Sequence, residues 1–101
     1  MLYISGQIPL NPSSQILISE DINAQIKQVF ENIRALCLAA GGNLSDVVKL
    51  AVYLMDLTDS HLVNSMMLDF FAQPFPARTM IQVAGLPRGA KIEVDAMMVI
   101  R

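Results

Sequence analysis

Residues 21–40 carry a continuous apolar stripe, the sequence feature that most constrains the fold. Its apolar residues recur at spacings of three and four, as on one side of an α-helix. Ser19 is predicted to cap the start, and Gly41 and Gly42 to end the helix in the left-handed conformation common there. Such a stripe has to be buried against a second layer, which the rest of the chain must supply. The stripe consists of Ile22, Ile26, Val29, Phe30, Ile33, Leu36, Cys37 and Ala40.

A strand and a second helix follow in the middle of the chain. Residues 48–55 alternate between apolar and mixed positions, which predicts a strand with one buried face. Apolar residues in 59–71 again recur at three and four, so we predict a helix there with Thr58 as its cap. Pro74 and Pro76 prevent that helix from continuing.

The two ends of the chain add further strands. Residues 78–83 and 91–100 have strand patterns, and the turn-forming stretch 85–89 between them predicts an antiparallel hairpin. At the front, we expect a strand at 2–5 and a short one at 16–18. The resulting order predicts an α+β fold with both helices on one face of a mixed sheet.

The composition indicates one domain whose surface is partly covered by a partner. The chain has 101 residues, enough for a single core. It is 53% hydrophobic and only 16% charged, so the charged side chains cover its surface thinly. Self-association is the simplest explanation, with the helix-free face of the sheet as the candidate interface.

Several functional classes are disfavoured by charge and hydropathy. A net charge of −2 and a pI near 5.1, with Lys and Arg scattered, argue against nucleic acid as the main partner. No apolar run approaches the length of a membrane helix, and the N-terminus lacks the pattern of a signal peptide. Cys37 is alone, which excludes an internal disulfide and a cysteine-based zinc site. We therefore expect a cytoplasmic, soluble domain without metal.

Three charged residues on the C-terminal strands are candidates for chemistry. Glu93 and Asp95 alternate with the apolar residues of strand 91–100, so they face away from the helices. Arg78 opens the strand predicted to be adjacent and could share that face. In a cleft between subunits, such an Arg and Glu would bind a small carboxylate and polarise a water. The alternative, which patterning alone favours, is a salt bridge of Arg78 with Glu93 or Asp95, or plain solvent exposure.

Short motifs occur in a fixed order along residues 2–101. They resemble the motifs of the RidA (YjgF) family, and the resemblance covers essentially the whole chain. The motifs are Ser5-Gly6-Gln7-Ile8-Pro9, Asn11-Pro12, Ala39-Ala40-Gly41-Gly42, Asp46-Val47-Val48-Lys49, Asp56-Leu57-Thr58-Asp59, Val63-Asn64, Phe75-Pro76-Ala77-Arg78-Thr79, Leu86-Pro87 and Lys91-Ile92-Glu93-Val94-Asp95-Ala96.

This resemblance implies a fold, an assembly and an activity. Members of the family have a chorismate-mutase-like α+β fold and form homotrimers with clefts between subunits. Their characterised activity is the hydrolysis of reactive enamine and imine acids, such as 2-aminoacrylate, that pyridoxal-phosphate enzymes release. The products are a 2-keto acid and ammonia, and no cofactor is needed.

The resemblance also assigns roles to individual residues. Arg78 would clamp the substrate carboxylate in a bidentate manner, and Glu93 would position or activate the attacking water. Ser5 and Asn64 would line the cleft. Met80, where many active members have cysteine, would also be a substrate-binding residue.

The chain departs from the family pattern in ways that leave two other functions open. We expect residues 1–101 to form a single domain without the family's N-terminal strand and loop, which carries an active-site tyrosine. That difference and Met80 favour a non-catalytic module that binds a keto acid or amino acid and regulates a partner. The segment between Phe71 and Phe75, which borders the predicted cleft, is also shorter than in many relatives. An RNA-directed role, described for some relatives, is disfavoured by the acidic pI.

Overall fold

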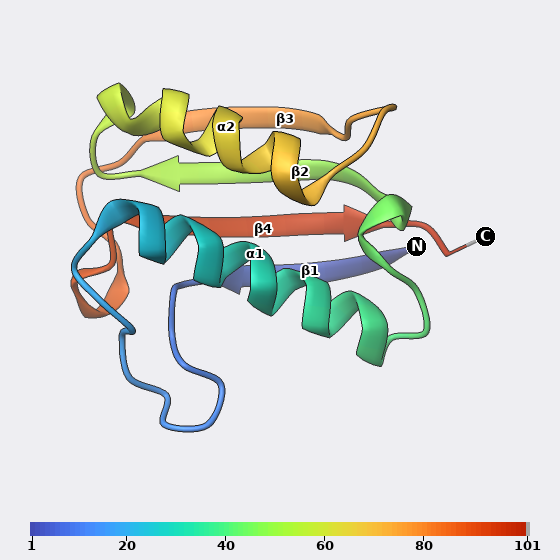
Figure 1. Cartoon of the computed structure of the whole chain (residues 1–101), viewed down its shortest axis with the longest axis horizontal. Helices are drawn as coiled ribbons and strands as arrows, with labels where there is room; N and C mark the ends of the chain where they lie inside the picture. Colours follow the sequence, from blue (N-terminus) through green and yellow to red (C-terminus); the bar gives the residue numbers. More distant parts are fainter. Residues whose placement is uncertain (101) are drawn as a thin grey trace.

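Four strands form one mixed sheet in the order β1-β4-β2-β3, and both helices lie on the same face of it (Figure 1). The computed structural model describes residues 1–100. The predicted α+β class with two helices on one sheet face is confirmed. In chain order the elements are β1 (Leu2–Gln7), α1 (Ile22–Ala39), β2 (Val47–Leu54), α2 (Ser60–Phe70), β3 (Ala77–Gln82) and β4 (Ile92–Met98).

The predicted hairpin between the last two strands is wrong. Helix α2 carries the chain back across the sheet, so β3 pairs parallel with β2 as in other strand–helix–strand units. The chain then passes the end of β2 and enters the sheet on its far side. There β4 pairs antiparallel with β2 and with β1. Strand β2 therefore separates β3 from β4 (Figure 1).

Side chains explain why β4 is central and β3 lies at an edge. The side chains of β4 that face the helices are all apolar and buried. In β3 the corresponding positions include Arg78 and Gln82, which are exposed. A central strand must bury its inner face completely, whereas an edge strand tolerates polar side chains. The buried residues of β4 are Ile92, Val94, Ala96 and Met98.

The apolar stripe of α1 fills the space between the helices and the sheet. Ile26, Val29, Ile33 and Cys37 are completely buried, as the helical periodicity predicts. Phe30 lies at the contact between the helices, with its ring centroid 5.5 Å from that of Phe70 and 5.9 Å from that of Phe71. Burial raises the pKa of the Cys37 thiol, which disfavours the reactive thiolate.

Two predicted helix caps are wrong. Asp21, not Ser19, caps α1, because its carboxylate accepts a hydrogen bond from the Ala24 amide at 2.9 Å. Before α2 the chain forms a 3₁₀ turn, Leu57–Asp59, which is capped by the carboxylate of Asp56. Both aspartates occupy positions that place a side-chain oxygen on free amide groups. The predicted ends of the two helices are otherwise within one or two residues of those observed.

The segment between β1 and α1 contains no second strand. Residues 16–18 form only an isolated bridge between Leu10 and Leu17, so the short strand predicted there is wrong. Asn32 of α1 fastens this loop by donating a hydrogen bond to the Leu10 carbonyl at 3.0 Å. Within residues 1–100, no helix is long and apolar enough to cross a membrane.

The end of α1 yields a stability prediction. Gly41 has a φ of +89°, a conformation that costs a residue with a Cβ about 1–2 kcal/mol. We expect Gly41→Ala to lower the melting temperature by roughly 4 °C or more, measured by circular dichroism. Gly85→Ala is the matched control, since Gly85 does not have a positive φ and nothing lies near its Cβ position. An equal decrease in both variants would contradict the assigned role of Gly41.

Candidate active site

Arg78 lies on the helix side of the sheet. It opens β3 and pairs in register with Leu50 of β2, a buried core residue, so both side chains point to the same side. There the guanidinium meets α2. Its Nη1 donates a hydrogen bond to Oδ1 of Asn64 and lies 3.4 Å from the sulfur of Met67. Arg78 and Asn64, two predicted site residues, are thus brought together.

The guanidinium of Arg78 retains donors for a ligand. Both of its hydrogen bonds within residues 1–100 use Nη1. Nε and Nη2 form the planar fork that matches the two oxygens of a carboxylate. Arg78 forms no ion pair in this part of the chain, where the sole salt bridge joins Glu31 and Arg34 of α1. The geometry is suited to binding a small carboxylate.

A groove of about 400 Å³ surrounds Arg78. Apart from Arg78 and Asn64, its walls are apolar. Met80, two residues along β3 on the same side, packs against the core and is not among the residues that line the groove. The lining residues are Asn64, Met67, Leu68, Phe75, Pro76 and Arg78.

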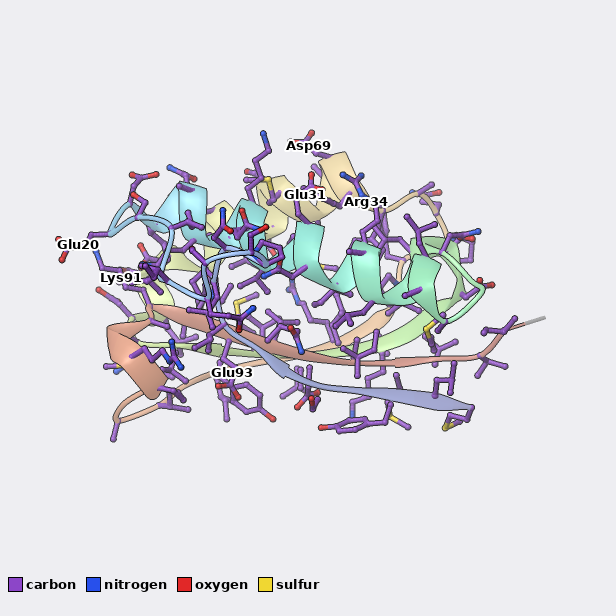
Figure 2. The ribbon with its side chains drawn as sticks, turned by 90° about the horizontal axis from the view of Figure 1, so that it is seen from below. Glu20, Glu31, Arg34, Asp69, Lys91 and Glu93 are labelled. Atoms are coloured by element: carbon purple, nitrogen blue, oxygen red, sulfur yellow. The ribbon has the colours of Figure 1, made fainter. Side chains whose placement is uncertain are left out.

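Glu93 lies on the opposite side of the sheet, away from the helices (Figure 2). It is half-buried in β4, opposite Tyr53 of β2. Its carboxylate lies against the backbone of β1, because a Cβ built on Gly6 would be 2.4 Å from Oε2 of Glu93. Any side chain at Gly6 would therefore displace this carboxylate. The exposed residue Ser5 immediately precedes Gly6, so the Ser5-Gly6 motif and Glu93 form a second group.

The expectation that Arg78 and Glu93 share one face within a single copy is wrong, and so is the salt bridge offered as its alternative. Strand β2 stands between their strands, and their side chains point to opposite sides of the sheet. One copy therefore holds two separate halves, a basic half with Arg78 and Asn64 and an acidic half with Glu93. The two halves cannot act on the same small molecule within one copy.

A second hollow contains no charged side chain. It measures about 320 Å³ and lies between the loop after β1 and helix α1. Its polar groups are amides, those of Gln7, Gln15 and Asn32. Neutral amides bind an ionised acid less strongly than a guanidinium does. Of these two hollows, the groove beside Arg78 is therefore the better suited to a small carboxylate.

Asp95 connects two tyrosines on the helix-free face, a cluster that the sequence interpretation missed. The hydroxyl of Tyr53 donates a hydrogen bond to Oδ2 of Asp95 at 3.2 Å. The negative charge of Asp95 raises the pKa of Tyr53, and hydrogen bonding to Asp95 raises the pKa of Tyr3. Alternation along β2 indicated that Tyr53 faces away from the helices. Its pairing with β4 was not readable from the sequence.

Comparison with known proteins identifies a matching family model, similar sequences and a similar structure. The family model described as Endoribonuclease L-PSP matches residues 1–100. The human 2-iminobutanoate/2-iminopropanoate deaminase is 41% identical over 98 residues, which cover 97% of this chain and 72% of that protein. The deaminase of the same name from Salmonella typhimurium is 41% identical over 104 residues, 100% of this chain and 80% of that one. The crystal structure of RidA from Psychrobacter sp. PAMC 21119 is 46% identical with a TM-score of 0.94, covering 97% and 79% of the two chains.

The tyrosine cluster yields a spectroscopic prediction. The chain has two tyrosines and no tryptophan, so the absorbance of tyrosinate reports on Tyr3 and Tyr53 alone. In Asp95→Asn the carboxylate charge is lost, and we expect both tyrosines to titrate at lower pH than in the unmodified protein. Asp69→Asn on the exposed side of α2 is the control and should leave the titration unchanged. An unaltered curve in Asp95→Asn would disprove the contact.

Proposed function

This chain belongs to the endoribonuclease L-PSP family, which includes the RidA (YjgF) proteins, and we propose that it hydrolyses 2-imino acids and their enamine tautomers. The products are a 2-keto acid and ammonia. The observation that carries the proposal is that Nε and Nη2 of Arg78 make no hydrogen bond within residues 1–100, while Arg78 lines a largely apolar groove. This arrangement suits a small carboxylate that is next to an uncharged reacting carbon. Relatives that bear the name 2-iminobutanoate/2-iminopropanoate deaminase support it.

Arg78 binds and orients the substrate. Its Nε and Nη2 take the two carboxylate oxygens, while Asn64 and Met67 hold the guanidinium through Nη1. The imine carbon is bonded directly to the carboxylate carbon, so this clamp also fixes the electrophile. An imine is already electrophilic, and orientation supplies much of the remaining rate acceleration.

Glu93 handles the proton of the attacking water. The carboxylate accepts a proton from water as the water oxygen bonds to the imine carbon, and it passes this proton to the imine nitrogen. In the resulting carbinolamine the hydroxyl proton is transferred to the nitrogen as the C–N bond breaks, which gives the keto group and ammonia. Water supplies the only atoms added, so the reaction as written needs no cofactor. Gly6 lets the Glu93 carboxylate lie against β1, and Ser5 borders the same site.

A complete site requires two copies of the chain. The basic half of one copy, which binds the substrate carboxylate, must meet the acidic half of the next, which accepts the proton, because the sheet separates the halves within a copy. Such a contact joins two different surfaces, and heterologous contacts that close form rings. Because members of the RidA family, which this chain resembles, form homotrimers, we propose a ring of three copies with one site in each of three clefts. The helix-free face, with Glu93, Asp95 and Tyr53, becomes the covered surface that the composition predicted.

The proposal also covers the location of the protein in the cell and its activity towards RNA. Imines of this kind react rapidly with water, so we expect the protein to act in the cytoplasm, where they are released. A ribonuclease activity, suggested by the family description, is not favoured, because the chain has a net charge of −2. The helix-free face also presents the carboxylates of Glu93 and Asp95, which repel phosphates.

Ammonia release tests the activity. Imines are generated in situ by an amino-acid oxidase, and the protein should accelerate the formation of ammonia and keto acid. In Arg78→Ala, kcat/KM should decrease by about 100-fold or more, because two charge-assisted hydrogen bonds are lost. Lys27→Ala removes the same charge from an exposed position on α1 and should retain full activity. Near-full activity of Arg78→Ala would refute the assigned role.

Mixing two inactive variants tests the composition of the site. Arg78→Ala and Glu93→Gln should each be inactive alone. If each site combines Arg78 of one copy with Glu93 of the next, equimolar co-refolded mixtures should regain about a quarter of the wild-type rate. Half of the copies retain Arg78 and the other half retain Glu93, so random pairing of neighbouring copies gives one intact site in four. Mixtures that remain inactive, although mass analysis shows mixed oligomers, would place the whole site in one copy.

A further inference from the structure

We infer that the groove beside Arg78 selects imino acids with a bulky apolar side chain, such as those derived from leucine or phenylalanine, over those derived from alanine. The inference rests on the proposed function, since it assigns the side chain of the substrate to the groove that binds its carboxylate. It concerns Leu68 and Phe75, which neither the binding of the carboxylate nor the attack of water requires.

Leu68 and Phe75 are large apolar side chains that are exposed to solvent in the groove that contains the Arg78 guanidinium. Leu68 is 68% exposed and Phe75 is 42% exposed in the single chain. Both line the groove, Leu68 from α2 and Phe75 from the segment that leads into β3. Leu68 lies one helical turn after Asn64, so it is on the same side of α2 as the residue that holds Arg78.

The chemistry of a 2-imino acid directs its side chain along these residues. The imine carbon itself carries the side chain and is bonded to the carboxylate that Arg78 binds. The side chain therefore begins within two bonds of the carboxylate. The polar wall at this point is Asn64, which is engaged with Arg78. The remaining walls, formed by Met67, Leu68, Phe75 and Pro76, present apolar surface to the side chain.

The size of the groove favours a larger occupant. Its volume of about 400 Å³ is within the range of small-molecule sites, roughly 300–1,000 Å³. A three-carbon acid would leave much of the apolar wall in water. An isobutyl or benzyl group would cover Leu68 and Phe75 and release that water, which is favourable in proportion to the apolar area buried.

The test compares imines of increasing side-chain size, generated by an amino-acid oxidase from alanine, 2-aminobutyrate, leucine and phenylalanine. We expect kcat/KM for the leucine-derived imine to exceed that for the alanine-derived imine by about 10-fold or more. In Leu68→Asn this ratio should decrease several-fold. Leu38→Asn is the matched control, since Leu38 is 60% exposed on α1 and does not line the groove, and its ratio should equal that of the unmodified protein.

Three results would overturn the inference while leaving the proposed function intact. The first is hydrolysis with the alanine-derived imine preferred. The second is a leucine-to-alanine ratio unchanged by Leu68→Asn. The third is a dissociated oligomer in Leu68→Asn alone, by sedimentation, which would show that Leu68 packs against the next copy.

Failure to hydrolyse any imine would instead refute the proposed function. The groove is then tested by binding alone, with the stable keto acids pyruvate and 4-methyl-2-oxopentanoate as probes and the melting temperature as the readout. Larger stabilisation by 4-methyl-2-oxopentanoate, lost in Leu68→Asn, supports the apolar groove. Equal or no stabilisation by the two probes overturns it.

Discussion

The pairing of β4 with β2 is the contact on which the rest of the structure depends. Its buried face of Ile92, Val94, Ala96 and Met98 gives the two helices a continuous apolar surface to cover. The same pairing places Glu93 opposite Tyr53 on the other face and moves β3 to the edge of the sheet. One hydrophobic requirement, a central strand with a fully apolar inner face, thus positions both groups of candidate site residues.

Separating the two candidate groups has a consequence within one copy and a cost for the proposed function. Within one copy the sheet separates Arg78 from Glu93, so the two charges do not pair there. Each is held independently, Arg78 by Asn64 and Met67 and Glu93 by the close approach of β1 at Gly6. The cost, under the proposed mechanism, is that a single copy is incomplete, so activity requires assembly.

The individual candidate site residues could be selected from the sequence, but their arrangement could not. Alternation along 91–100 correctly placed Glu93 and Asp95 on the face away from the helices, and motif resemblance singled out Arg78 and Asn64. The wrong step was to join the last two strands as a hairpin because the turn between them is rich in glycine and proline. Local turn chemistry says that the chain changes direction, but not which strand it meets next. The cluster of Tyr3, Tyr53 and Asp95 was missed for the same reason.

The sequence by itself determined both helices, the main strands and the buried faces of α1, α2, β2 and β4, because the periodicities of helix and strand are local properties of the backbone. It also determined, through its motifs, the family to which the chain belongs. Only the tertiary structure decided strand order, and with it the separation of Arg78 from Glu93 on opposite sides of the sheet. Strand order depends on which apolar faces can be buried together, a competition among residues distant in the chain that no local pattern records.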